Sequence, residues 1–281
     1  MKKEKIIRHK ARIVAKEFSQ IPGRDYEETY APMACMETIR MLIATAIHNR
    51  YSIHQMDVKS PFLNEINAEE IYVQQSQGFE IPAEEEKVYR LAKALYGLKQ
   101  APRAWNSNID MHLIRSSFER CPVEPSLYTK RSQGEIIILL LYVDDLIITG
   151  SSPEMIREFK MNLMQQYEMP DLGLMKFFLG IQDQQASNFI FLSQEKCARV
   201  LLVKFQLDGV NSTTSPMATS DKLGKRKEEE EKCNYETYRS LIGSLIYLTK
   251  TRPDLEYSVN VLSRFIFDPG KQHFAAAKRV M

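Results

Sequence analysis

The sequence predicts a folded α+β protein, because its 281 residues contain helical patterns together with strand pairs that are joined by short turns. Hydrophobic residues make up 44% of the chain and charged residues 26%, which is typical of globular proteins and argues against a disordered or fibrous chain. The strongest pattern is the apolar run 136–143, which Asp144 and Asp145 interrupt and residues 146–150 resume. A continuous apolar run of strand length indicates a strand covered on both faces. We therefore expect a hairpin in the core with two carboxylates at its tip.

Periodicity and turn residues predict the other elements in order. Ser152 and Pro153 supply an N-cap and a first helical residue for a helix that runs to residue 167. Residues 218–233 are charged and nearly free of apolar side chains, so we interpret them as a linker. Strands are also expected at 10–18, 51–56, 177–181 and 189–192, and helices at 36–47, 102–114, 195–205, 235–248 and 253–265.

Charge is unevenly distributed, although the net charge is only +2. Residues 1–16 and 87–103 are rich in lysine and arginine, whereas residues 84–86 and 228–231 are acidic. Basic segments that are separated from acidic ones favour a phosphate-binding surface. The alternative is an ordinary solvated lysine face.

Several classes of protein are excluded. The longest apolar run has eight residues, against the roughly 20 that a membrane-spanning helix needs, so no membrane partner is expected. The N-terminus has no apolar stretch of signal-peptide length behind its lysines. The cysteines form no C-x-x-C pair, which argues against a zinc ribbon or a disulfide scaffold and indicates reduced intracellular thiols; they are Cys35, Cys121, Cys197 and Cys233.

The carboxylates at the hairpin tip are the candidate site. Two negative charges beside an apolar strand pair are costly unless a cation neutralises them, and hard divalent cations prefer such oxygen ligands. Asp57 ends another expected strand, and with Asp144 and Asp145 it would complete a set that holds two Mg²⁺ ions about 3.5–4 Å apart for phosphoryl transfer. The alternative is that the two adjacent aspartates simply form a polar turn.

Three sequence words around these aspartates resemble the reverse transcriptase of copia-type long-terminal-repeat retrotransposons. They are QMDVKS (55–60), KALYGLKQAPRAW (93–105) and LYVDDLIITG (141–150). The flanking words KARIVAKEF, DYEETYAP, METIR, FFLGIQ and VNVLSRF resemble the same family in the same order. The resemblance extends from about residue 10 to the end of the chain.

The resemblance implies an RNA-directed DNA polymerase with the right-hand fold of fingers and palm. Asp57 and Asp144 would be the principal ligands of two Mg²⁺ ions, for which Mn²⁺ could substitute, and Asp145 the third acidic member. The partners would be an RNA or DNA template with an annealed primer, and deoxynucleoside triphosphates. The nucleotide would be bound by Lys10, Arg12, Phe62, Tyr96, Gly97 and Lys99, and the primer terminus would be gripped by Phe178, Leu179, Gly180 and Ile181.

The resemblance also implies a division of the chain. Residues 1–190 would form fingers and palm, 191–217 a thumb-like segment, 218–233 the charged linker, and 234–281 a helical connection to a ribonuclease H domain that the family has beyond this point. It implies a cytoplasmic location, and the basic N-terminus is equally compatible with a template-facing segment and with a nuclear signal. The oligomeric state is left open.

The chain departs from the family pattern at several positions. The family usually has Ala at Pro61, Gly at Glu65, Gly at Glu17 and Arg at Cys35. Pro61 matters most, because a backbone amide just before the bulky residue Phe62 would donate to the triphosphate and proline has no N–H. The alternative to an active polymerase is therefore a catalytically impaired, truncated retroelement remnant that folds and binds nucleic acid.

Overall fold

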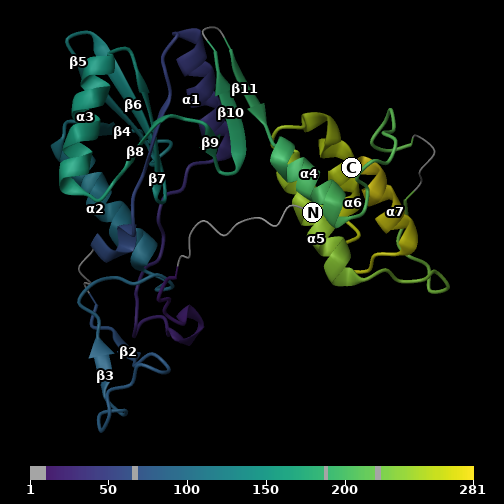
Figure 1. Cartoon of the computed structure of the whole chain (residues 1–281), viewed down its shortest axis with the longest axis horizontal. Helices are drawn as coiled ribbons and strands as arrows, with labels where there is room; N and C mark the ends of the chain where they lie inside the picture. Colours follow the sequence, from purple (N-terminus) through teal and green to yellow (C-terminus); the bar gives the residue numbers. More distant parts are fainter. Residues whose placement is uncertain (1–10, 65–68, 187–188, 219–222) are drawn as a thin grey trace. The chain divides into compact units, whose positions relative to one another are not determined.

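The structure is a computed structural model that describes residues 11–64, 69–186, 189–218 and 223–281 (Figure 1). The chain divides into two compact units, Met1–Met175 and Lys176–Met281. The assignment of residue ranges to fingers, palm, thumb and connection stays a prediction. The expected α+β class is confirmed, because helices accompany antiparallel sheets in both units.

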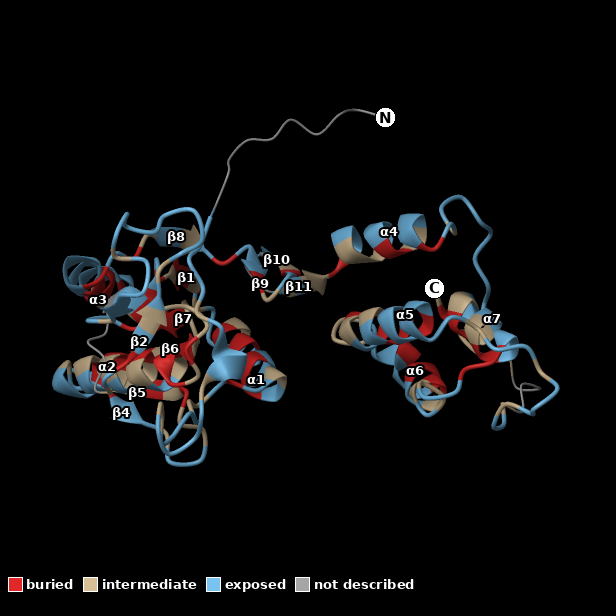
Figure 2. Cartoon of the chain, turned by 90° about the horizontal axis from the view of Figure 1, so that it is seen from below, coloured by how far each residue is buried: buried red, intermediate tan, exposed pale blue. Residues whose placement is uncertain are grey.

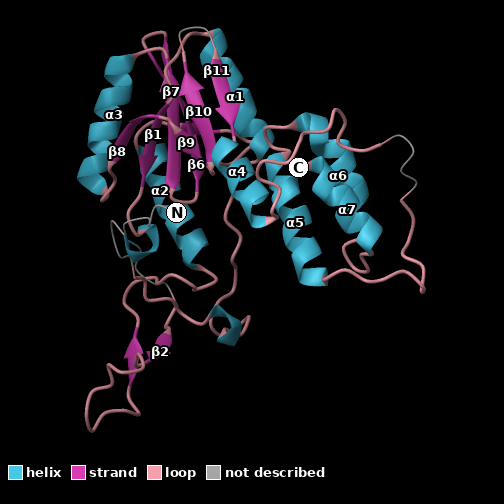
Figure 3. Ribbon diagram, turned by 45° about the vertical axis from the view of Figure 1, so that its right-hand side comes forward, coloured by secondary structure: helices cyan, strands magenta, loops and turns pink. Residues whose placement is uncertain are grey.

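A six-stranded antiparallel sheet forms the centre of the first unit, in the order β4-β5-β6-β7-β1-β8. Its strands are β4 (Glu119–Arg120), β5 (Leu127–Ser132), β6 (Glu135–Tyr142), β7 (Asp145–Gly150), β1 (His54–Asp57) and β8 (Asp171–Leu174). β6 and β7 are the expected hairpin, and most of their apolar side chains are buried. The prediction of a central strand pair is therefore confirmed, and Figure 3 shows these strands side by side.

Three helices cover the sheet. Figure 2 shows α2 (Ala101–Arg115) and α3 (Pro153–Gln166) on one side and α1 (Met36–His48) on the other. α2 and α3 share one apolar cluster with the strands, to which Trp105, Leu139 and Phe159 belong. The Ser152 side chain accepts a hydrogen bond from the Met155 amide, which confirms the predicted N-cap. A small hairpin of β2 (Tyr72–Gln74) and β3 (Val88–Arg90) completes the unit.

The predicted strand at 10–18 is wrong over its described residues. Residues 11–16 have no regular secondary structure and lead into a 3₁₀ turn, Glu17–Ser19. The Ala15 amide donates to the Tyr96 carbonyl at 2.7 Å, but none of the strands that the structure describes pairs with residues 11–16. Loose alternation is not sufficient for a strand when no neighbouring backbone completes the ladder.

The second unit begins with a three-stranded sheet, in the order β11-β10-β9. Its strands are β9 (Phe177–Phe178), β10 (Ile181–Gln185) and β11 (Ile190–Ser193). The predicted single strand at 177–181 is wrong, because Leu179 and Gly180 have φ values of 50° and 76° and form a turn between β9 and β10.

Helices form the rest of the second unit around an apolar cluster that includes Leu201, Leu241, Leu245 and Leu262. They are α4 (Glu195–Lys204), α5 (Tyr235–Leu248), the 3₁₀ turn Pro253–Leu255, α6 (Glu256–Ser263) and α7 (Lys271–Val280). α7 lies in the segment 234–281 that the resemblance implies to be helical, and Phe274 and Ala277 follow Gly270 at helical spacing. Within the described part of the chain, no helix has the length and apolarity needed to cross a membrane.

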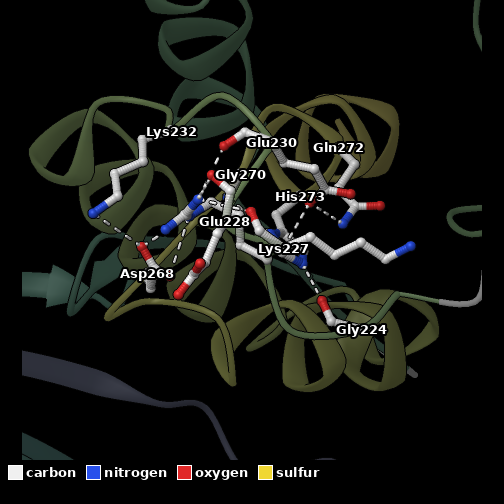
Figure 4. Close-up of polar contacts among 10 residues, drawn as sticks. Gly224, Lys227, Glu228, Glu230, Lys232, Asp268, Gly270, Gln272 and His273 are labelled. Atoms are coloured by element: carbon white, nitrogen blue, oxygen red, sulfur yellow. Dashed lines mark hydrogen bonds and ion pairs between the residues drawn. The ribbon is translucent and has the colours of Figure 1, made fainter.

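The described part of the charged segment, residues 223–233, has no helix or strand, yet it is tied to the start of α7 (Figure 4). The Arg226 guanidinium donates to both carboxylate oxygens of Asp268 at 3.1 Å and to the Glu230 carbonyl at 2.9 Å. The buried ring of His273 accepts from the Gly270 amide at Nδ1, 2.9 Å, and its Nε2 lies 2.8 Å from the Gly224 carbonyl oxygen. The composition of this segment predicted a linker, but contacts of the Arg226 and His273 side chains attach it to the residues around the start of α7.

Candidate functional site

The three predicted carboxylates lie where neighbouring interior strands of the central sheet begin or end. Asp57 is the last residue of β1 and lies directly opposite Asp145, the first residue of β7. Asp144 occupies the two-residue turn that joins β6 to β7. Antiparallel pairing of β1 with β7 therefore brings together residues that are far apart in the sequence.

The turn that carries Asp144 is held by buried donors. Val143 has a φ of 53°, which is unusual for a β-branched residue. Its carbonyl accepts a hydrogen bond from Nε1 of Trp105 at 2.8 Å, and the Trp105 side chain is only 1% exposed. The Val58 amide donates to the Asp144 carbonyl at 2.9 Å. These contacts fix the backbone that presents the two aspartates.

Two of the carboxylates have side-chain partners. Gln55 Nε2 donates to Asp145 Oδ1 at 3.0 Å, and the Tyr96 hydroxyl donates to Asp144 Oδ2 at 2.8 Å. Burial raises the pKa of Asp145, and the neighbouring charges of Asp57 and Asp144 raise it further. Burial and the hydrogen bond to Asp144 raise the pKa of Tyr96 to about 12, so its hydroxyl keeps its proton at neutral pH and donates a hydrogen bond.

The donor set fits a hard divalent cation. Burial is the main cause of the raised pKa of Asp145, and the nearby charges of Asp57 and Asp144, which a cation would offset, add to it. However, among the residues that the structure describes, no three Asp, Glu, His or Cys side chains are grouped so that they could hold a metal ion. The residue types and their register suit Mg²⁺, and in this structure Asp145 and Asp144 accept hydrogen bonds from Gln55 and Tyr96, respectively.

Four of the residues expected to bind the nucleotide meet around Tyr96. The Phe62 ring lies 4.6 Å from the Tyr96 ring, and the Arg12 guanidinium lies 5.2 Å from the centre of that ring. Gly97 has a φ of 87°, and a Cβ atom there would overlap the Ala15 carbonyl oxygen. Arg12, Phe62, Tyr96 and Gly97 thus form one cluster next to Asp144.

The other two residues expected to bind the nucleotide are Lys99 and Lys10, and the structure does not place either of them in this cluster. The Lys99 ammonium donates to the Tyr26 hydroxyl at 3.2 Å, and its backbone amide donates to Gln20 Oε1 at 2.8 Å. Lys99 is therefore engaged by the loop near residues 20–26. Lys10 lies outside the described residues, as does Glu65. Pro61 opens the 3₁₀ turn Pro61–Asn64 immediately before Phe62.

The expected primer grip lies in the second unit, at the β9–β10 turn. Phe178 and Ile181 are buried, and the Leu179 carbonyl accepts a hydrogen bond from the Tyr247 hydroxyl. A Cβ atom on Gly180 would overlap that same hydroxyl oxygen. The close contact with Tyr247 therefore explains, within this unit, why position 180 is a glycine.

Sequence reasoning missed the two polar partners of the carboxylates. Gln55 precedes Asp57 by two residues on the same strand, so strand alternation places both side chains on one face and could have identified it. The bond between Tyr96 and Asp144 spans 48 residues and had no local signal.

Comparison of the sequence with known proteins identifies the family of the chain. Residues 1–219 match the family described as reverse transcriptase (RNA-dependent DNA polymerase). The chain belongs to this family. The predicted resemblance to copia-type reverse transcriptases is also confirmed by relatives from transposons.

Two similar relatives are plant retrovirus-related Pol polyproteins. The one from transposon TNT 1-94 of Nicotiana tabacum is 38% identical over 99% of this chain, and the one from transposon RE1 of Arabidopsis thaliana is 36% identical over 98%. The chain spans 22% and 19% of their lengths, respectively. The putative transposon Ty5-1 protein of Saccharomyces cerevisiae is 35% identical over 80% of this chain and 74% of its own length.

Proposed function

We propose that this chain is an RNA-directed DNA polymerase that adds deoxynucleotides to a primer 3′-hydroxyl on a nucleic-acid template. The observation that carries the proposal is the register of Asp57 against Asp145, with Asp144 in the adjoining turn. In this proposal the six-stranded sheet is the palm of a right-hand polymerase, and residues 191–217 and 234–281 serve as thumb-like and connecting parts.

Asp57, Asp144 and Asp145 would hold two Mg²⁺ ions. When bound, the ions would lower the pKa of the primer hydroxyl and neutralise charge on the departing pyrophosphate. The protein's own part is to position these carboxylates, through the Trp105 and Val58 bonds to the turn.

Arg12 and Phe62 would select the incoming nucleotide. The Arg12 guanidinium, which lies over the Tyr96 ring, would pair with a triphosphate by charge and hydrogen bonds. Phe62 is 6% exposed and is braced by Tyr96, so its ring would resist displacement by a ribose 2′-hydroxyl and favour deoxynucleotides. Template and primer would be held by their phosphates, which makes binding sensitive to salt.

A second candidate is a folded remnant that binds nucleic acid but is impaired in catalysis. The observation that favours it is Pro61, which sits directly before Phe62 and has no amide hydrogen. Loss of one donor to a charged phosphate would reduce nucleotide use roughly ten- to a hundredfold.

Primer extension on a short RNA template annealed to a DNA primer tests the proposal. We expect Asp144→Asn to abolish extension in both Mg²⁺ and Mn²⁺, because it removes the charge of a metal ligand. Glu158→Gln, which removes the charge of an exposed carboxylate on α3, is the control and should leave extension unchanged. Equal extension by Asp144→Asn and the unaltered chain would contradict the proposal.

Pro61→Ala separates the two candidates. Extension that appears or rises at least tenfold in this variant would locate an impairment at the nucleotide site. Binding of primer and template that weakens with salt, without extension by any variant, would instead support the remnant.

A further inference from the structure

We infer that Tyr247 is a positioning residue for the primer terminus, because its hydroxyl fixes the β9–β10 turn that is expected to grip the primer. The inference rests on the proposed function. Tyr247 lies on α5, in the same compact unit as the turn. It is outside residues 1–219, which match the reverse transcriptase family, so that match assigns no role to it.

The β9–β10 turn has a backbone that its own residues do not favour. Leu179 and Gly180 have φ values of 50° and 76° and join Phe178 to its paired residue Ile181. Two-residue turns with positive φ at both positions favour Asn or Asp before the glycine, because other side chains are strained there. β9 contributes only two residues to the ladder. Contacts from outside the hairpin are therefore needed to hold Leu179 in this conformation.

Tyr247 supplies such a contact at the tip of the turn. Its hydroxyl donates to the Leu179 carbonyl at 2.5 Å. The same hydroxyl lies so close to Gly180 that an added Cβ atom would overlap it. The hydrogen bond sets the direction of the Leu179 carbonyl, and the packing sets the position of the Gly180 backbone.

The backbone of Tyr247 is held in turn by Gln194. Gln194 follows β11 directly, and its side chain donates from Nε2 to the Tyr247 carbonyl at 3.0 Å. Its Oε1 accepts from the Thr251 hydroxyl at 2.9 Å, and the residue is only 4% exposed. Buried amides need such partners, so these bonds tie the end of α5 to the β9–β11 sheet. The Tyr247 hydroxyl therefore acts on the turn from a fixed helix.

The contact lies at the part of the turn that a primer could reach. Phe178 and Ile181 are buried, whereas Gly180 is exposed, and glycine permits close approach of another backbone. A shift of this tip would displace a bound primer 3′-hydroxyl, and a displacement of about 1 Å in a reacting group can cost roughly a hundredfold in rate. The nucleotide cluster around Tyr96 shares none of these residues, so nucleotide binding should not change.

The fluorescence of 2-aminopurine at the 3′ end of a primer annealed to an RNA template tests the inference on the full chain. Binding of the unaltered chain should change this fluorescence, and Tyr247→Phe should reduce the change at equal saturation. Affinity, measured by anisotropy, should stay the same because phosphate contacts dominate it. The matched control is Tyr238→Phe, which removes a 2.8 Å hydroxyl bond from α5 to the Leu262 carbonyl and should keep the full signal. Equal signals from Tyr247→Phe and the unaltered chain would overturn the inference.

The kinetics of primer extension provide a second readout. Displacement of the attacking hydroxyl in Tyr247→Phe should lower kcat roughly ten- to a hundredfold and leave the KM for the deoxynucleotide unchanged. Tyr238→Phe should match the unaltered chain. An equal fall of kcat in both variants would reflect a general weakening of the second unit, and it would count against a positioning role for Tyr247.

Gly180→Ala reaches the same contact from the opposite side and does not depend on the folding of Tyr247→Phe. The added Cβ atom would overlap the Tyr247 hydroxyl, so the turn or the tyrosine must move. The 2-aminopurine signal should fall in Gly180→Ala as it does in Tyr247→Phe. The double variant should lose little more than Tyr247→Phe alone, because the hydroxyl is already absent. A full signal from folded Gly180→Ala would contradict the inference.

The binding measurement separates failure of this inference from failure of the proposed function. If the unaltered chain binds and extends the primer, and Tyr247→Phe matches it in signal and in kcat, the polymerase stands and only the role of Tyr247 falls. If the unaltered chain does not bind the primer and template, the proposed function falls and the inference falls with it. A chain that binds without extending is still tested by the fluorescence of the primer terminus.

Discussion

Gly97 shows how a single residue without a side chain shapes the nucleotide side of the candidate site. Its φ of 87° is a left-handed conformation, and a Cβ atom would overlap the Ala15 carbonyl oxygen and lie 2.7 Å from Val14 Cγ1. The segment 11–16 therefore passes directly over the Tyr96–Gly97 backbone. This close approach is what brings Arg12 over the Tyr96 ring.

Gly97→Ala is expected to destabilise the protein by two effects, a strained φ and a steric overlap. Gly134→Ala is the matched control, because Gly134 has a φ of 85° but nothing within 4 Å of the added Cβ. In urea unfolding the control should cost about 1 kcal/mol, and Gly97→Ala should cost about 1–3 kcal/mol more. Equal costs would mean that the 11–16 segment does not press on Gly97.

At the scale of elements, the β9–β11 sheet carries an ionisable group on its buried face. Asp183 on β10 is 5% exposed, and both of its carboxylate oxygens are buried. Burial raises its pKa to about 6, and Gln185 on the same strand partly opposes this shift. The neighbouring buried residues Phe178 and Ile181 are apolar, so the neutral form of Asp183 suits this face better than the charged form.

The raised pKa of Asp183 predicts that the second unit loses stability as pH rises. Because the folded-state value lies above the ordinary 3.8, the contribution is fully present below about pH 4 and is lost as pH rises through about 6. Asp183→Asn cannot ionise, so it should remove about 1–2 kcal/mol of this pH dependence between pH 4 and pH 7, after allowance for solvent screening. Urea unfolding followed by circular dichroism at the two pH values measures the effect.

The exposed Asp208 provides the control for this prediction. Asp208→Asn should leave the pH dependence of unfolding as it is in the unaltered chain. A parallel pH profile for Asp183→Asn and the unaltered chain would show that Asp183 is not the group responsible.

At the scale of the whole molecule, each compact unit has its own apolar core. Leu139 belongs to the core of the first unit and Leu245 to that of the second, and both are fully buried. The single tryptophan, Trp105, lies in the first unit, so its fluorescence reports unfolding of that unit alone. Circular dichroism reports both units.

We expect the two cores to respond separately to mutation. Leu245→Ala should destabilise the second unit by about 2–5 kcal/mol and shift the unfolding seen by circular dichroism, while the Trp105 fluorescence transition stays in place. Leu139→Ala, the matched change in the other core, should shift the fluorescence transition by a similar energy. If Leu245→Ala shifts both signals together, the two units unfold as one.

The sequence by itself determined the α+β class, the central hairpin and most helices, because these depend on local periodicity and on nearby capping residues. The apolar run of β6, the N-cap Ser152 and the spacing in α1 are signals carried by adjacent residues. The ordered words around Asp57 and Asp144 determined the family in the same way. The expected strand at 10–18 does not form, and the expected strand at 177–181 is interrupted by a turn at Leu179 and Gly180. Both expectations were wrong because alternation within a segment does not show whether another strand pairs with it.

Only the tertiary structure decided how these pieces meet. Pairing of β1 with β7 places Asp57 opposite Asp145, packing of the 11–16 segment places Arg12 on Tyr96, and the Tyr96 hydroxyl reaches Asp144 across 48 residues. The charged residues 223–233 resemble a linker in composition but are anchored through Arg226. Each of these contacts joins residues that are brought close by the packing of whole elements. That packing depends on many contacts between distant parts of the chain, so no local sequence pattern predicts it.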